Sequence, residues 1–284
     1  MKKKIAILGT NGFLNKNIST NIDTKNFEII KLGKKNYDLK CDYLDINQII
    51  KTLNKYNFDS IINCIGYTNI DNLPKDRELC FLLNAKVTQN LVQGINNSKS
   101  KPFLIHFSTD HLYSTKGYSK EDNINIKNYY ALTKLYSEYF AGFTKSIVLR
   151  SNFFGKSKHE LKISLSDWII KSLKNNKKIY VFNDILFNPI TFDTLGKIIN
   201  IILNNKKIGI FNVGSKNGFS KSQFAKILAN HYNLNRKLLI PTSYKKILKN
   251  IRPKDMRMDC NKFQKYFKIN IPTLEEEIKN NDLV

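Results

Sequence analysis

The chain has 284 residues, with 47 Lys and Arg against 23 Asp and Glu, and therefore a formal net charge of +24. This length can bury a self-sufficient core, and 42% hydrophobic with 12% aromatic residues argue against a disordered chain. The lysines are spread along the whole sequence, which is typical of a solvated surface rather than of a nucleic-acid patch. We therefore expect no nucleic-acid partner, and nucleic-acid binding is an alternative that only the net charge supports.

The cysteines and the first residues indicate the cellular compartment. No two cysteines form a CxxC pair, which argues against a zinc ribbon or a thioredoxin-like motif and favours a reducing compartment. The apolar run 5–8 after the basic start is too short for a signal peptide, and no later segment approaches the length of a membrane span. We therefore expect a cytoplasmic protein without a membrane partner.

Short apolar runs alternate with helical patterns through the first half of the chain. The run 5–8 predicts a buried strand, and the pattern recurs at 27–32, 60–65 and 103–107. Helical spacing is found at 46–53 and 84–95. This order predicts right-handed βαβ units and an α/β fold of the Rossmann type, with a doubly wound parallel sheet.

The second half of the chain is less regular. Strands are expected at 146–150, 178–182 and 209–213, and helices at 165–173, 194–203, 222–232 and 274–280. We expect residues 1–150 to form a first lobe, to which residues 178–212 return. A smaller, interleaved C-terminal lobe would comprise residues 151–177 and 213–284.

A glycine-rich turn follows the first strand and leads into a helix. Its sequence, Gly9-Thr10-Asn11-Gly12-Phe13-Leu14-Asn15, has the GxxGxxG spacing with Asn15 in place of the third glycine. Glycines in such a turn let the backbone approach a pyrophosphate, which then lies at the helix N-terminus. The turn predicts a dinucleotide site, and a glycine turn without a ligand is the alternative.

The residues after the second strand indicate which dinucleotide is bound. An acidic residue there binds the ribose 2′-hydroxyl, whereas basic residues accept a 2′-phosphate. The sequence is Gly33-Lys34-Lys35-Asn36, with no acid before Asp38. NADPH is therefore favoured over NADH, and NADH is the alternative because lysines are frequent throughout the chain.

Tyr130 and Lys134 are the candidate proton-delivering pair. They stand four residues apart in a segment with helical character, so both side chains lie on one helix face. A nearby ammonium stabilises a phenolate, which makes proton transfer from tyrosine feasible near neutral pH. Thr109 follows the run 103–107 at the sheet edge where α/β folds bind ligands, and its hydroxyl can bind a substrate carbonyl. Ser108 is the competing hydroxyl, and an ordinary helix cap is the alternative.

Several motifs occur in the order found in extended short-chain dehydrogenases. They are the glycine turn, Asn63-Cys64-Ile65-Gly66-Tyr67-Thr68, Leu83-Asn84-Ala85, Ser108-Thr109-Asp110 and the Tyr130 to Lys134 pair. More specifically, the chain resembles the dTDP-4-dehydrorhamnose reductase family. Later landmarks support this: Leu149-Arg150-Ser151-Asn152-Phe153-Phe154-Gly155, Asn183-Asp184, Asn188-Pro189-Ile190-Thr191 and Arg252-Pro253 followed by Asp259. The resemblance spans nearly the whole chain.

This resemblance implies a Rossmann lobe with a smaller nucleotide-sugar lobe. It also implies NAD(P)H-dependent reduction of the 4-keto group of a nucleotide-linked deoxysugar, in the synthesis of a surface polysaccharide precursor. By position, Tyr130 is the acid, Lys134 lowers its pKa and holds the nicotinamide ribose, and Thr109 polarises the keto oxygen. The implied cofactor contacts are Gly9, Asn11, Gly12, Phe13, Leu14, Lys34, Lys35, Asp45, Ile46, Cys64, Ile65, Gly66, Tyr67, Asn84, Tyr130 and Lys134. The implied substrate contacts are Thr68, Asp110, His111, Asn152, Phe153 and Arg252.

Besides Asn15, four positions depart from the family's pattern. His111 replaces a tyrosine, Phe153 a tryptophan and Ala131 a glycine, and Asn17 stands where some relatives carry a glutamate that binds magnesium at a dimer contact. We therefore predict no metal and leave a homodimer open. An epimerase of the same family and a non-catalytic NADP-binding regulatory subunit are the alternatives to the reductase.

Overall fold

The computed structural model describes residues 2–34 and 37–281, which group into two compact units. Unit 1 consists of the described residues of Met1–Ser108, Tyr129–Leu149 and Gly196–Ile210. Unit 2 consists of those of Thr109–Asn128, Arg150–Leu195 and Phe211–Val284.

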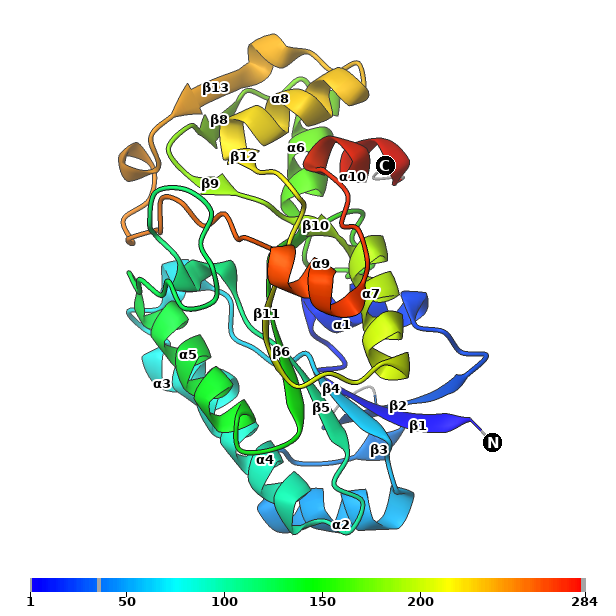
Figure 1. Cartoon of the computed structure of the whole chain (residues 1–284). Helices are drawn as coiled ribbons and strands as arrows, with labels where there is room; N and C mark the ends of the chain where they lie inside the picture. Colours follow the sequence, from blue (N-terminus) through cyan, green and yellow to red (C-terminus); the bar gives the residue numbers. More distant parts are fainter. Residues whose placement is uncertain (1, 35–36, 282–284) are drawn as a thin grey trace. The chain divides into compact units, whose positions relative to one another are not determined.

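The main sheet has seven strands in the order β11-β6-β5-β4-β1-β2-β3 (Figure 1), and all of its residues group with unit 1 except 150–151 and 211–213, which group with unit 2. The strands are β1 (Lys3–Leu8), β2 (Phe27–Gly33), β3 (Leu39–Lys40), β4 (Ser60–Asn63), β5 (Phe103–Phe107), β6 (Ser146–Ser151) and β11 (Gly209–Val213). From β3 to β6 all neighbouring strands pair in parallel. The order reverses direction at β1 and β4, as in a doubly wound sheet, so the Rossmann-type fold expected from the sequence is confirmed.

Helices connect these strands. They are α1 (Phe13–Ile18), α2 (Ile46–Tyr56), α3 (Arg77–Phe81), α4 (Val87–Asn97), α5 (Tyr129–Ala141) and the later part of α7 (Phe192–Asn204). A π-helical turn, Leu82–Lys86, joins α3 to α4, so helical structure begins before residue 84. Ile49 and Leu53 of α2, Leu91 and Ile95 of α4 and Ala141 of α5 belong to one buried cluster with sheet residues. The apolar faces of these helices therefore form one half of the core of unit 1.

Unit 2 contains three two-stranded sheets, β10-β7, β12-β9 and β13-β8. Their strands are β7 (Phe153–Phe154), β8 (Ile179–Phe182), β9 (Leu186–Phe187), β10 (Ile190–Thr191), β12 (Phe219–Ser220) and β13 (Leu239–Thr242). The helices are α6 (Leu165–Lys174), α8 (Lys221–His231), α9 (Asn261–Phe267) and α10 (Leu274–Asn280). The ring of Phe224 lies edge-on to Phe154 and Phe187, with centroid distances of 5.1 and 5.4 Å, at the centre of the core of this unit.

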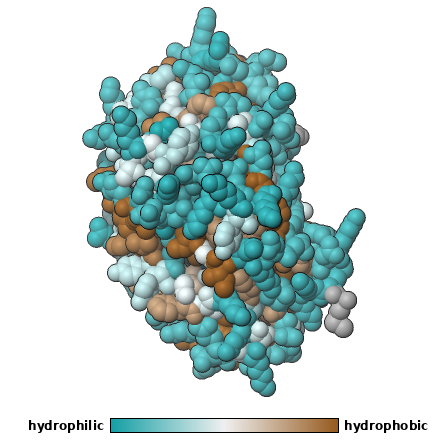
Figure 2. All heavy atoms as spheres, viewed as in Figure 1, coloured by the Kyte–Doolittle hydropathy of each residue, from teal (hydrophilic) through white to brown (hydrophobic). Residues whose placement is uncertain are grey.

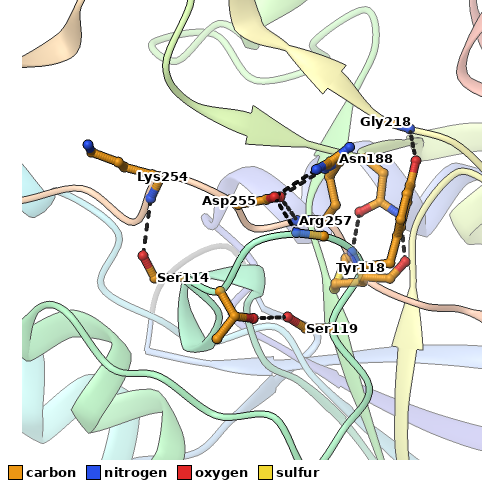
Figure 3. Close-up of polar contacts among 11 residues, drawn as sticks. Ser114, Tyr118, Ser119, Asn188, Gly218, Lys254, Asp255 and Arg257 are labelled. Carbon is orange, nitrogen blue, oxygen red and sulfur yellow. Dashed lines mark hydrogen bonds and ion pairs between the residues drawn. The ribbon is translucent and has the colours of Figure 1, made fainter.

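A polar cluster centred on Asp255 fixes the loop that follows residue 112 within unit 2 (Figure 3). The buried Asp255 carboxylate accepts hydrogen bonds from Gly117 N at 2.8 Å and from Arg257 Nε and Nη2 at 2.9 and 2.7 Å. The Arg257 guanidinium lies 4.9 Å from the ring centroid of Tyr118, whose hydroxyl accepts from Gly218 N at 2.9 Å. Bidentate pairing and stacking satisfy the buried charge and order the loop.

The two units differ from the expected lobes in two segments. Residues 109–128 group with unit 2, and of the segment 178–212 only residues 196–210 lie in unit 1. The run 178–182 does form a strand, β8, but its partner is β13 of unit 2. An apolar run shows that a strand is buried but does not show which strand it pairs with. The assignment of nucleotide and sugar to the two lobes stays a prediction.

Hydrophilic side chains cover most of the face drawn in Figure 2. Within residues 2–34 and 37–281, no helix has both the length and the apolar character required to cross a membrane.

Candidate active site

The glycine turn after β1 forms one wall of a pocket of about 370 Å³ in unit 1. Gly9 has φ +79°, and Gly12 N donates to Gly9 O at 2.7 Å. A Cβ atom on Gly9 would lie 3.0 Å from the backbone carbonyl of Cys64, and one on Gly12 would lie 2.8 Å from Gly9 O. The turn thus requires glycine at both positions and leaves its backbone open to a ligand. The pocket is lined by Gly9, Thr10, Asn11, Gly12, Gly33, Lys34, Asp42, Tyr43, Leu44, Ile65, Leu83 and Val87.

The asparagines at the two unusual positions of this turn and helix are both engaged with backbone. Asn15, at the third glycine position, is buried, and its Nδ2 donates to Leu8 O at 3.3 Å, which joins α1 to β1. Asn17 donates to Phe13 O at 2.7 Å within α1. In the described part of the chain, no group of three or more His, Cys, Asp and Glu side chains is arranged to hold a metal ion. Phe13 and Leu14 form the first turn of α1.

The pocket also contains an acid, Asp42, that the sequence pattern missed. Lys34 Nζ forms an ion pair with Asp42 Oδ2 at 2.7 Å, and both residues line the pocket. Asp42 follows the short strand β3, so it reaches the pocket from a strand that the hydrophobic pattern did not reveal. Asp38 is instead bound to the backbone N of Lys31 at 2.8 Å, and Lys35 lies outside the described residues.

Two further residues implied as cofactor contacts lie at the start of α2. Asp45 is the N-cap of this helix and accepts from Gln48 N at 3.1 Å and from Gln48 Nε2 at 2.9 Å. Ile46 is the first residue of the helix. Neither belongs to the pocket lining, and their contact with a cofactor stays a prediction.

The segment after β4 is held by Asn84. Ile65 lines the pocket, and Cys64 beside it is buried. Asn84 Oδ1 accepts from Tyr67 N at 2.8 Å, and its Nδ2 donates to Thr133 Oγ1 of α5 at 2.9 Å. Asn84 lies in the π-helical turn, a feature that occurs often at functional sites. It thereby links the Gly66–Tyr67 segment to the helix of the candidate pair, whereas Thr68 is exposed.

Tyr130 and Lys134 both lie on α5 and are buried, and Lys134 is only 4% exposed. Lys134 Nζ donates to Phe107 O, at the end of β5, at 2.5 Å. Burial lowers the pKa of Lys134 to about 8, and the Glu138 carboxylate opposes this shift. A lysine with this pKa still carries a positive charge at neutral pH, and that charge stabilises the phenolate form of a tyrosine on the same helix face.

The hydroxyls of Ser108 and Thr109 have different partners. Ser108 Oγ donates to Glu138 Oε1 within unit 1. Thr109 belongs to unit 2, where its Oγ1 accepts from His111 N at 3.2 Å and caps the short 3₁₀ turn Asp110–Leu112. Thr109 therefore acts as the helix cap that the alternative interpretation expected. Its contact with a substrate stays a prediction.

Unit 2 brings together most of the implied substrate contacts. Asp110 is 2% exposed and accepts from Asn152 Nδ2 at 2.7 Å. Burial raises the pKa of Asp110 to about 6, although the Asn152 amide opposes the shift. Burial also lowers the pKa of His111 to about 3, and the positive charges of Lys221 and Arg252 add to this effect. His111 is thus neutral near two cations, and of these only Arg252 is among the contacts that the sequence implies.

Phe153 completes this group of implied contacts. Its ring centroid lies 5.4 Å from that of Phe192. An aromatic ring at this position supplies the apolar surface that the tryptophan of the family pattern would supply.

The doubly wound sheet, the glycine turn and the Tyr-x-x-x-Lys helix define a protein of the extended short-chain dehydrogenase type. The chain belongs to the RmlD substrate binding domain family, whose model matches residues 3–281. The resemblance seen in the sequence motifs is thereby confirmed.

Known proteins similar to this chain agree with that membership. The dTDP-4-dehydrorhamnose reductase of Sinorhizobium fredii is 22% identical over 97% of this chain and 95% of its own length. A probable low-salt glycan biosynthesis reductase of Haloferax volcanii is 22% identical over 66% of this chain, and the match spans 64% of that protein. The crystal structure of dTDP-4-dehydrorhamnose reductase from Bacillus anthracis in complex with NADP superposes with a TM-score of 0.87, at 23% identity and 99% coverage of both chains.

Proposed function

We propose that this protein uses NAD(P)H to reduce the 4-keto group of a nucleotide-linked deoxysugar, in the synthesis of a surface polysaccharide precursor. The observation that carries the proposal is the buried Tyr130 and Lys134 pair on α5, in the same unit as the pocket of the glycine turn. A protein that only binds a dinucleotide has no need of the full set of Thr109, Tyr130 and Lys134. The relatives named as dTDP-4-dehydrorhamnose reductases support the substrate class, and the NADP complex supports the cofactor.

The residues around the pocket fit a dinucleotide. The backbone of Gly9 to Gly12 would hold the pyrophosphate, with Asn11, Phe13 and Leu14 beside it, and Ile65 would lie against the nicotinamide side. Lys34 would accept the 2′-phosphate of NADPH. Asp42 would accept the 2′-hydroxyl of NADH, which supports use of both dinucleotides with NADPH preferred.

The reduction requires a hydride and a proton at the two ends of the C=O bond, and a bound nicotinamide supplies the hydride. Tyr130 donates its phenolic proton to the keto oxygen as the carbon accepts the hydride. Lys134 keeps a positive charge on the same helix face, so the phenolate that remains is stabilised. Thr109 is the hydroxyl that hydrogen-bonds the keto oxygen and polarises the bond.

Unit 2 supplies the chemistry for an anionic sugar nucleotide. Arg252 and Lys221 provide positive charge for the diphosphate, because both raise the electrostatic potential at His111. Asp110 and Asn152 provide hydrogen-bonding groups for sugar hydroxyls, and Phe153 provides an apolar face. Thr68 is a further substrate contact in this proposal. A homodimer and a cytoplasmic location stay predictions.

A substrate screen tests the proposal. The purified protein is incubated with nucleotide-linked 4-keto-6-deoxy sugars and NADPH or NADH, oxidation of the dinucleotide is followed by absorbance, and the sugar product is identified by NMR. Tyr130→Phe should lower kcat by about 10²- to 10⁴-fold, the usual contribution of a general acid, and leave the Kd for NADPH unchanged. Tyr129→Phe is the matched control, since Tyr129 stands next in the same helix with Arg77 over its ring and should keep wild-type turnover.

The same screen separates the alternatives. A changed sugar stereocentre without net oxidation of NADPH would identify an epimerase. Tight NADPH binding with no turnover on any sugar would identify a non-catalytic subunit. Equal turnover by wild type and Tyr130→Phe would refute the assignment of the proton donor.

A further inference from the structure

A second buried charge lies one helical turn after Lys134. Glu138 is 3% exposed, and it stands four residues after Lys134 on α5, on the same helix face. Its Oε1 accepts a hydrogen bond from the buried Ser108 hydroxyl, which directly follows the end of β5. A carboxylate is almost never buried unless a counter-charge and hydrogen bonds compensate the lost hydration. The proposed reaction gives Glu138 no part.

The titratable groups that act on Lys134 come from the segment after β4, from α3, from β5 and from α5 itself. Cys64 follows β4, Cys80 lies on α3, His106 lies on β5, and Tyr130 and Glu138 lie on α5 with Lys134 itself. Burial raises the pKa of both thiols, so they are uncharged at neutral pH. Burial, with the Lys134 charge, lowers the pKa of His106 well below its usual value, so the imidazole is neutral as well. Among these groups Glu138 is the one carboxylate, and it gives the largest opposition to the effect of burial on the pKa of Lys134.

We infer that Glu138, held by Ser108, is a positioning residue that keeps Lys134 in its charged form for the proposed reduction. The ammonium also donates to Phe107 O at 2.5 Å, next to the residue that binds Glu138. Both members of the pair are thus attached to the same end of β5. The kinetic consequence of this inference rests on the proposed function, whereas the charge state of Lys134 does not.

Removal of the Glu138 carboxylate should lower the pKa of Lys134. The pKa of Lys134 is already lowered to about 8 by burial, with Glu138 opposing that shift. A neutral side chain at residue 138 lowers this pKa further, so Lys134 loses its proton closer to neutral pH. A neutral lysine no longer stabilises the Tyr130 phenolate. The activity of the variant should therefore fall at a lower pH than that of the wild type.

The experiment compares Glu138→Gln with wild type in the full-length protein by two readouts. Side-chain NMR of isotope-labelled lysine, with the Lys134 signal assigned by its loss in Lys134→Met, follows the titration of Lys134 directly. The pH profile of kcat is measured with the keto sugar and NADPH. We expect both the Lys134 titration and the alkaline limb of kcat to move down by about one pH unit. Glu78→Gln removes the same charge from an exposed site on α3 and should move neither.

Two further variants keep the test decisive. Glu138→Asp should bring the Lys134 titration part of the way back to its wild-type pH, because the carboxylate returns on a shorter side chain. Ser108→Ala should move the Lys134 titration in the same direction but by less, and it serves if Glu138→Gln does not fold. An unmoved Lys134 titration in a folded Glu138→Gln or Ser108→Ala protein overturns the inference. A shifted titration without turnover in any variant, wild type included, overturns the proposed function and leaves the inference in place.

Discussion

The ion pair between Lys34 and Asp42 should decide how the pocket distinguishes NADPH from NADH. The Lys34 side chain is 57% exposed and that of Asp42 32%, so the pair resembles a surface salt bridge, worth about 0–1 kcal/mol. Such a pair opens readily when a phosphate competes for the lysine. Lys34→Ala removes one charge-assisted contact to the 2′-phosphate, worth about 1.5–3 kcal/mol, and should weaken NADPH about 10- to 100-fold. NADH, which has no 2′-phosphate, should bind almost unchanged.

Asp42→Asn should act in the opposite sense. Release of Lys34 from its partner should tighten NADPH by up to about fivefold, which corresponds to ~1 kcal/mol. Asp42 is the proposed acceptor of the ribose 2′-hydroxyl, so loss of its carboxylate should weaken NADH by about tenfold or more. Isothermal titration calorimetry with both dinucleotides measures the effects, and Lys31→Ala, an exposed lysine on β2, is the control for net charge. Equal weakening of NADPH and NADH by Lys34→Ala would refute the reasoning.

Two more variants test the glycine turn and the buried acid. Gly12→Ala places a Cβ 2.8 Å from Gly9 O and should weaken dinucleotide binding at least about tenfold in titration calorimetry; unchanged affinity would show that the turn does not carry the pyrophosphate. Asp110 has its pKa raised to about 6 from 3.8, so the folded state holds the proton more tightly than the unfolded state. Below about pH 4 Asp110 is protonated in both states and does not lower the free energy of unfolding. Between about pH 4 and 6 the unfolded state ionises first, so the free energy of unfolding falls as the pH rises; above about pH 6 the loss stays constant. Asp110→Asn should therefore raise the free energy of unfolding near pH 7 by about 1–3 kcal/mol and near pH 4 by almost nothing, as urea unfolding at both pH values can show. A larger loss of stability near pH 7 than near pH 4 would mean that the fold prefers the ionised carboxylate.

Much of the fold could be predicted because its signals are local. The run 5–8 ends at a glycine, and the buried strand and tight turn follow from these residues alone. The spacing of Tyr130 and Lys134 likewise places both on one face of α5. The pairing of β8 with β13 depends on residues about 60 positions apart, and nothing in either run selects that partner.

The residues that the sequence did not reveal act through distant neighbours. Asp42 reaches the pocket because β3 pairs with the end of β2, and a two-residue strand has no hydrophobic period to detect. Lys221 resembles any other lysine in the sequence until its charge is seen to act on Asp110 and His111. The four-residue spacing between Lys134 and Glu138 is visible in the sequence. In a helix, however, two opposite charges at this spacing more often form an ordinary surface pair.

The division of the chain into two units has a consequence for biosynthesis. The chain passes from one unit to the other after residues 108, 128, 149, 195 and 210, and the last strand of the large sheet ends at Val213. Before residue 151 has left the ribosome, the edge of β5 that later pairs with β6 has no partner strand, although every residue of β5 is buried in the finished fold. Exposed edges of this kind promote aggregation, and slow synthesis prolongs their exposure. The nascent protein should therefore depend on chaperones over this interval, and neither unit should be obtainable by cutting the gene at a single point.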